Sequence, residues 1–514
     1  MADSAVVPTL YRNGRVHSPV SSAATAFVVA DAALVWIGRE DGAAQYRELP
    51  TVDLGGALVT PAFVDAHVHT TSTGLALSGL DLRAANSLDA ALGAVERAAR
   101  AARGRPILGG GWDDTNWPER RAPTAAELDR ASYGGAVYLA RVDVHSAATS
   151  SALMAAVPRL RELTGYDPRG WQRGPAHDAV RAAAHQALTA GQRRDAQRTA
   201  LRQAASLGIA CVHEMAGPVI SSESDFAGLL ALAADEPLPE VIGYWGELFG
   251  ITAARELGAV GAGGDLFCDG SLGSHTAALH GPYADRPETS GGLRFETDDV
   301  AEHILRCAEA GLQAGFHAIG DAAVDQVLDA VDVVAARIGR MEGGRHRIEH
   351  AAYVRDPVRL AASGLLASMQ PGFDAHWGGP EGMYAQRVGP ERALALHRFG
   401  DLAAAGVPLA FGSDSPVTEL GPWAAVRAAV HPSDPAAAIG TAAAFTAHTE
   451  AGWRFAGRDG EGVLVAGAPA TFAVWRAGSL ASGLPDVAPG LGLPQCLATV
   501  RRGTTIFDGE LLEG

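Results

Sequence analysis

The stretch "FVDAHVHTT", residues 63–71, decides the fold. An apolar run ends in two histidines, His67 and His69, which are two positions apart. Alternate side chains of a strand point to the same face, so both imidazoles project together at the carboxyl end of this strand. Neutral imidazole is a common ligand of zinc-like ions. The pattern predicts a metal site, with two ordinary structural histidines as the alternative for this pair taken alone.

Seven further strand-like runs alternate with alanine-rich helical segments, which is typical of βα units around a parallel sheet. Eight such strands predict a (β/α)8 barrel of the TIM type. The gap after the first run is far longer than one helix, so we expect an inserted α/β subdomain at about residues 80–200. The eight predicted strands are 63–69, 209–214, 241–245, 265–269, 312–317, 346–350, 365–370 and 409–414.

Both ends of the chain are rich in short alternating strands separated by polar turns. Residues 1–60 and 455–514 therefore predict one small β-sandwich domain built from both termini. The barrel would then occupy residues 61–454, and the fold class is α/β with a distorted barrel.

The composition favours a globular enzyme with a small-molecule substrate, since 47% of the 514 residues are hydrophobic and 19% are charged. The net charge of −17 provides no basic patch for nucleic acid. No apolar run reaches the roughly 18 residues that a membrane span needs. The four cysteines are far apart, which argues against disulfides and thiolate zinc sites. We expect a cytoplasmic protein that binds neither nucleic acid nor membrane.

All 41 basic residues are arginine, and the chain contains no lysine. This excludes lysine Schiff bases, phosphate-binding loops that use a lysine, and metal sites bridged by a carboxylated lysine.

Three more predicted strands end in metal-binding residue types. "AGFHAIGD" ends its strand at His317, "RHRIEHAAY" at His350 and "PLAFGSDSPV" at Asp414. The carboxyl ends of parallel barrel strands converge on one mouth, where active sites lie. Unpaired polar groups there cost free energy without a function, so we expect a metal centre. A turn or helix-capping role before Pro416 is the alternative for Asp414.

These motifs, together with "GGGWDDTNWPERRAPTAAELD", "RVDVHSAATSSAL", "DGSLGSHTA" and "SMQP", resemble the metal-dependent amidohydrolase superfamily. More narrowly, the series is similar to the YtcJ-like branch, which includes N-substituted formamide deformylases. The resemblance implies one or two ions of zinc or a similar divalent metal, and it makes a homodimer plausible. It also implies that Asp414 is a ligand and the general base. The implied histidine ligands are His67, His69, His317 and His350.

The fourth predicted strand, in "GGDLFCDGSLGSHTA", departs from the resembling proteins. Their bridging lysine is replaced here by Asp265, whose shorter carboxylate either reaches a metal or binds none. Strand alternation places Asp265 and Asp269 on one face and Cys268 on the other, where Cys268 packs as an inert core residue. Asp269 is expected to orient a ligand histidine or the following turn. Glu214 is an alternative replacement ligand.

Three residues are candidates for contact with the substrate. Trp112, with Asp113 and Trp117, either covers the mouth as a lid or forms the core of the insertion. His145 follows a short strand and is a candidate hydrogen-bonding group. Arg294 either anchors an anionic group of the substrate or is a solvated loop residue.

The sequence thus predicts a hydrolase that cleaves a non-peptide C–N bond of the amide or formamide type with a metal-activated water. The same site could instead serve an esterase, a lactonase or a deaminase. A catalytically silent binding protein is the alternative from another class.

Overall fold

An eight-stranded parallel sheet forms the centre of the computed structural model, which describes residues 7–509 apart from 103, 105 and 340–343. The sheet closes into a barrel because Val68 pairs with Ser415 and the Asp414 amide donates to His67 O at 2.8 Å. The strands, in order around the barrel, are β7 (Phe63–Val68), β13 (Ile209–Ala216), β14 (Glu240–Trp245), β15 (Gly261–Ala262), β16 (Gln313–Ala318), β17 (Arg347–His350), β18 (Leu366–Met369) and β19 (Leu409–Phe411).

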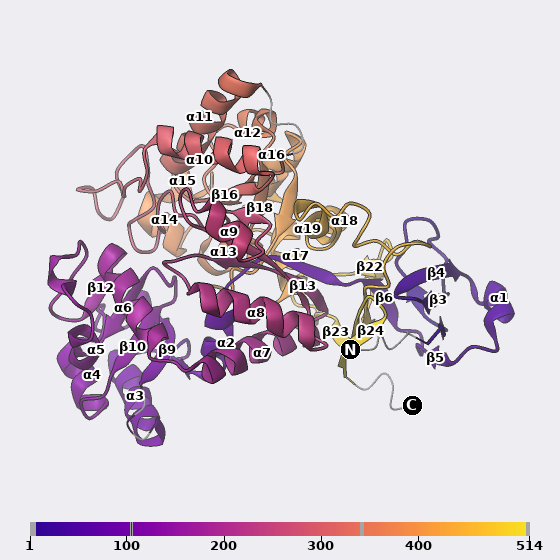
Figure 1. Cartoon of the computed structure of the whole chain (residues 1–514), viewed down its shortest axis with the longest axis horizontal. Helices are drawn as coiled ribbons and strands as arrows, with labels where there is room; N and C mark the ends of the chain where they lie inside the picture. Colours follow the sequence, from indigo (N-terminus) through magenta and orange to yellow (C-terminus); the bar gives the residue numbers. More distant parts are fainter. Residues whose placement is uncertain (1–6, 103, 105, 340–343, 510–514) are drawn as a thin grey trace.

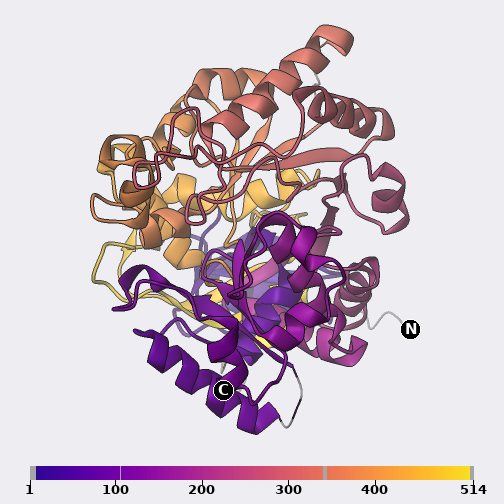
Figure 2. The ribbon, with the colours of Figure 1, turned by 90° about the vertical axis from the view of Figure 1, so that its left-hand side faces the viewer.

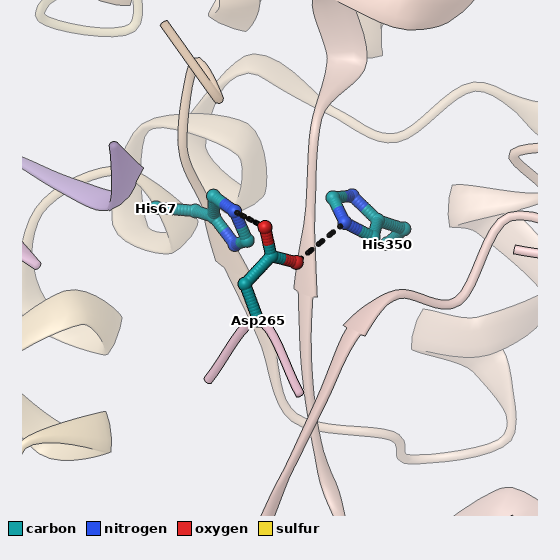
Figure 3. A group of neighbouring side chains, drawn as sticks. All are labelled: His67, Asp265 and His350. Carbon is teal, nitrogen blue, oxygen red and sulfur yellow. Dashed lines mark ion pairs between the residues drawn. The ribbon is translucent and has the colours of Figure 1, made fainter. Parts of the chain in front are cut away.

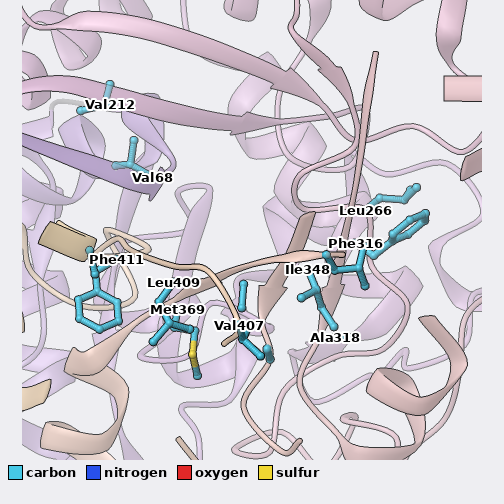
Figure 4. Packing of buried hydrophobic residues seen from close by; sticks show 14 of the residues in the cluster. Val68, Val212, Leu266, Phe316, Ala318, Ile348, Met369, Val407, Leu409 and Phe411 are labelled. Atoms are coloured by element: carbon cyan, nitrogen blue, oxygen red, sulfur yellow. The ribbon is translucent and has the colours of Figure 1, made fainter. Parts of the chain in front are cut away.

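Helices cover the outer face of the barrel (Figure 1). Apolar side chains on this face form the main core. Phe316 and Ile348, which face each other on neighbouring strands, lie in this cluster with Phe411 (Figure 4). The principal covering helices are α2 (Thr70–Ser78), α7 (Ala190–Ser206), α8 (Glu223–Asp235), α9 (Ile251–Glu256), α10 (Thr297–Ala310), α11 (Asp321–Ile338), α12 (Pro357–Ser363), α13 (Pro371–Trp377), α16 (Phe399–Ala404), α17 (Pro422–Val430), α18 (Thr441–Ala447) and α19 (Glu450–Phe455).

The fourth strand lies earlier than the sequence predicted, so the expected strand at 265–269 is wrong. The regular strand β15 ends at Ala262, and two glycines follow. Gly263 has φ 154°, and a Cβ there would lie 2.2 Å from the amide nitrogen of Gly315. The chain pairs with β16 again only at Phe267, opposite His317. This local pairing is enough to preserve the predicted alternation of inward and outward side chains.

The expected insertion after the first strand is present as a separate five-stranded sheet with its own core (Figure 2). The long helix α7 is not part of it, because α7 packs against α2 and β13 of the barrel. None of the described helices combines the length and the apolar character that crossing a membrane requires. The insertion contains β8 (Leu80–Asp81), α3 (Leu88–Ala102), β9 (Ile107–Trp112), α4 (Ala125–Ala131), β10 (Val137–Arg141), β11 (Ser146–Thr149), α5 (Ser151–Ala155), β12 (Trp171–Arg173) and α6 (Gly174–Gln186).

Strands from both ends of the chain build a two-sheet unit, on the side of the barrel away from the insertion (Figure 1). One buried cluster joins the sheets and includes Phe27, Leu34 and Phe472. The predicted sandwich is therefore present. Its sheets contain β1 (Thr9–Arg12), β3 (Ala26–Ala30), β4 (Ala33–Gly38) and β5 (Thr51–Asp53), and β2 (Arg15–Val16), β6 (Leu58–Pro61), β20 (Phe472–Arg476), β23 (Gln495–Arg501) and β24 (Thr504–Asp508).

Candidate metal centre

The five predicted ligands meet at the mouth of the barrel, the opening at the carboxyl ends of its strands. Two groups, which we call half-sites, face each other there. In the first, Asp414 Oδ1 lies 3.1 Å from His69 Nε2 and 3.4 Å from His67 Nε2. The second contains His317 and His350, whose ring centroids are 4.4 Å apart. All five side chains are buried.

Two of these predicted ligands have a left-handed backbone conformation, which directs their side chains into the mouth. His350 has φ 69° and Asp414 has φ 54°. Such angles cost a non-glycine residue roughly 1–2 kcal/mol, so the surrounding structure must hold them in place. Because Ile348 packs outward, regular alternation would also direct His350 outward. The turn at the strand end reverses this and brings its ring to the site.

Hydrogen bonds fix which nitrogen each ring presents. Three histidines direct Nδ1 to an acceptor, which places the proton there and leaves Nε2 free as a ligand. His317 is oriented the other way, since its Nε2 lies 3.1 Å from Gly270 O and its Nδ1 faces the site. The three acceptors are Glu349 Oε2 for His67 at 2.9 Å, Met215 O for His69 at 2.9 Å and Gln370 Oε1 for His350 at 2.8 Å.

The residues at the mouth fit a divalent metal. Within the described chain, His67 Nε2, His350 Nε2 and Asp414 Oδ1 are buried atoms without a hydrogen-bond partner. Leaving such atoms unpaired costs free energy, and a bound cation would satisfy all three. Imidazole nitrogen and carboxylate oxygen are also the donor set that zinc-like ions prefer.

Asp265 lies between the half-sites (Figure 3). Its Oδ2 is 3.3 Å from His69 Nε2 and 3.9 Å from His67 Nε2. Its Oδ1 is 3.1 Å from His317 Nδ1 and 3.5 Å from His350 Nε2. One carboxylate oxygen therefore faces each half-site, as a bridging ligand requires.

The carboxylates make the mouth attractive to cations. Burial would lower the pKa of His69, but Asp265 and Asp414 outweigh it and raise this pKa to about 10. Burial would also lower the pKa of His67, but Asp414, Glu349 and Asp265 together raise it. Their negative charge thus favours positive charge at the position that a metal ion would occupy.

A buried ion pair supports the first half-site, and sequence reasoning missed it. Glu349, which accepts the His67 bond, also accepts from Arg347 Nε at 2.7 Å, and both side chains are 0% exposed. Burial would raise the pKa of Glu349, but Arg347 and His67 lower it to about 2. Arg347 also bonds Ala66 O and His213 Nδ1. The sequence did contain a signal for this pair, because Arg347 and Glu349 are charged residues within the buried strand of "RHRIEH".

Two other carboxylates have structural partners. Asp269 accepts from the backbone amides of Ala278, Ile319 and Gly320, so it holds the chain that follows His317. Glu214 Oε2 accepts from the Thr70 amide at 2.8 Å, at the start of α2. Neither belongs to the groups with metal-ligand spacing among the described residues.

A cavity of about 870 Å³ opens from the predicted metal ligands toward the insertion. His145 and Arg294 line it, and the His145 ring lies 5.6 Å from that of His317. Asp113 and Trp117 also line it. The structure does not bring Trp112 to this cavity.

Trp112 lies in the core of the insertion. Its side chain is 0% exposed, and its Nε1 donates to Leu139 O at 2.8 Å. This placement does not support contact with the substrate and agrees with the alternative that Trp112 forms the core of the insertion.

Comparison with known proteins places this geometry in a family. The profile of the Amidohydrolase family matches residues 50–507. The chain belongs to this family. It is a hydrolase of the metal-dependent amidohydrolase superfamily, as the ordered motifs predicted.

Three similar proteins illustrate the relationship. "Putative amidohydrolase YtcJ" of Bacillus subtilis is 27% identical over 411 residues, which are 74% of this chain and 75% of that protein. The N-substituted formamide deformylase of Arthrobacter pascens is 24% identical over 460 residues, 80% and 82% of the two chains. The crystal structure of an uncharacterized metal-dependent hydrolase from Pyrococcus horikoshii is 26% identical, with a TM-score of 0.75 covering 93% of this chain and 100% of that one. The predicted fold class is thereby confirmed.

Proposed function

We propose that this protein hydrolyses a non-peptide C–N bond of the amide or formamide type, with Asp414 as the general base. The observation that carries the proposal is the set of buried atoms of His67, His350 and Asp414 that have no hydrogen-bond partner among the described residues. His350 and Asp414 also line the cavity of about 870 Å³. The similarity to an N-substituted formamide deformylase supports the bond type.

We further propose that the two half-sites hold two ions of zinc or a similar metal. His67, His69 and Asp414 would hold one ion, and His317 and His350 the other. Asp265 would bridge them in a chain that has no lysine to do so. A divalent ion held here would lower the pKa of a water toward about 7 and polarise the substrate carbonyl.

The protein's own groups would carry the proton. Burial would raise the pKa of Asp414, but His67 and His69 lower it. In its ionised form this carboxylate can accept a proton. Asp414 would take this proton from the attacking water and deliver it to the leaving nitrogen. His145 lies beside His317 in the cavity, where its ring could hydrogen-bond the substrate.

The test is the Asp414→Asn variant, with Asp401→Asn at an exposed position of helix α16 as the matched control. We expect Asp414→Asn to fold and to lower kcat by about 10²- to 10⁴-fold on whichever substrate a panel identifies. The panel comprises formamides, N-acyl amines, lactones and aminopurines. Near-normal turnover by Asp414→Asn would remove it from the base role. Activity confined to lactones or aminopurines would reassign the reaction.

A further inference from the structure

Arg294 presents its guanidinium to the cavity, with one long ion pair to Asp178. Its side chain is 31% exposed, and the guanidinium makes no hydrogen bond to any part of the chain that the structure describes. Its nearest carboxylate oxygen is Asp178 Oδ2, 3.7 Å from Nη1, which is too far for a good hydrogen bond. The planar fork of donors is therefore available to a ligand.

The guanidinium is held close to the metal ligands. Its carbon lies 5.0 Å from the ring centroid of Phe267, and that ring lies 4.9 Å from the ring of His317. The Arg294 amide donates to Cys268 O at 2.8 Å, which fixes the backbone of the loop. One aromatic ring thus separates the guanidinium from a predicted metal ligand, a distance that a short substrate can span.

The charges around Arg294 leave positive charge in excess at this end of the cavity. Asp178 is shared with Arg181, whose Nη2 is 3.4 Å from it. The Nε of Arg181 is a buried donor with no partner in the described chain. Burial is the main cause that holds the pKa of His177 well below its usual range, and the positive charge of Arg181 is the second. One carboxylate therefore faces two guanidinium groups.

Other acidic residues of the cavity are already engaged. Asp143 accepts from Ser274 and Arg141, and Asp113 accepts from Arg141. Asp81 is paired with Arg83. None of these carboxylates neutralises the end of the cavity at Arg294.

From this arrangement we infer that the substrate carries a carboxylate, which Arg294 binds while the scissile amide lies at the metal ligands. This inference rests on the proposed function and narrows it to amides with an anionic group on the acyl or the amine part. Guanidinium and carboxylate form two parallel charge-assisted hydrogen bonds, which fix both the position and the orientation of the ligand.

The first experiment compares matched substrates that differ only in charge. N-formyl derivatives of glycine, β-alanine and 4-aminobutanoate are assayed against their carboxamides, which have the same shape without the charge. We expect the wild type to favour at least one carboxylate. Arg294→Gln should raise the KM of that carboxylate by about 10- to 100-fold and should change the KM of its carboxamide much less. Arg294→Lys keeps the positive charge but loses the two parallel N–H donors of the guanidinium, so we expect an intermediate rise in KM.

The second experiment measures binding without turnover. Calorimetric titration of the same six compounds into metal-loaded Asp414→Asn, alone and combined with Arg294→Gln, reports the carboxylate contact even if none is hydrolysed. Arg306→Gln, which removes a charge on α10 outside the cavity, is the control and should leave binding unchanged.

The outcomes separate the two proposals. Binding that depends on Arg294 without any hydrolysis would support the subsite and contradict the proposed reaction. Tighter binding of the carboxamides, equal losses for both members of each pair in Arg294→Gln, or no carboxylate binding at all would overturn the inference.

Discussion

Replacing Glu349 by glutamine tests how the buried ion pair supports the first half-site. In the native protein His67 donates from Nδ1 to Glu349 at 2.9 Å, and Arg347 binds both oxygens of the same carboxylate. Glutamine keeps the shape but removes the charge. Arg347, which is 0% exposed, would remain buried without its counter-charge. Removing one partner of a buried ion pair costs about 3–5 kcal/mol of stability.

The same variant should weaken metal binding. A glutamine amide can donate to His67 Nδ1, which would move the ring proton to Nε2 and remove the lone pair that faces the site. Loss of such a partner lowers metal affinity by about 10- to 100-fold. Urea unfolding of the apoprotein measures the first effect, and competition with a chromophoric zinc chelator measures the second.

Glu302→Gln is the control, because Glu302 pairs with Arg306 on the exposed face of α10. We expect it to change stability by less than about 1 kcal/mol and to leave metal affinity unaltered. Wild-type stability together with wild-type metal affinity in Glu349→Gln would refute the supporting role of Glu349.

Four further predictions concern the bridging carboxylate, two helical glycines and the buried cysteine. Asp265→Ala should retain no more than one ion per chain by elemental analysis, and two retained ions would show that Asp265 is not the bridge. Gly74→Ala should lower stability by about 1–3 kcal/mol, because its Cβ would lie 1.8 Å from Ala196 O. A Cβ at Gly93, in helix α3, would lie no closer than 3.6 Å to any described neighbour, so Gly93→Ala should instead raise stability by up to about 1 kcal/mol in the same unfolding assay. Cys268 is buried and its thiol pKa is raised by burial, so thiol reagents should leave the native enzyme active, and rapid inactivation with modification at Cys268 would contradict this placement.

Strand-end histidines are predictable from sequence because a barrel directs the carboxyl ends of its strands to one place. His67, His69 and His317 follow this rule directly. The alternation of side chains along β17 does not predict that His350 lies in the mouth. Its ring points there because His350 itself has a left-handed backbone conformation at the end of β17. The motif order located it, whereas the alternation of the strand did not.

Contacts between distant strands were not predictable. The fourth strand is shorter than predicted, because Gly263 and Gly264 have positive φ and the regular pairing with β16 ends before them at Ala262. The support of His67 by Glu349 joins β7 to β17, and a single sequence does not report which strands face each other across the barrel. Trp112 was ambiguous because an aromatic residue fits a lid and a core equally well.

The most direct test of the metal centre is the metal content of the purified protein, measured by elemental mass spectrometry together with activity. The proposed two half-sites predict two zinc-like ions per chain, loss of activity on chelation and recovery when metal is added. Protein that contains no stoichiometric metal, and that neither binds added metal nor changes in activity with it, would contradict the account.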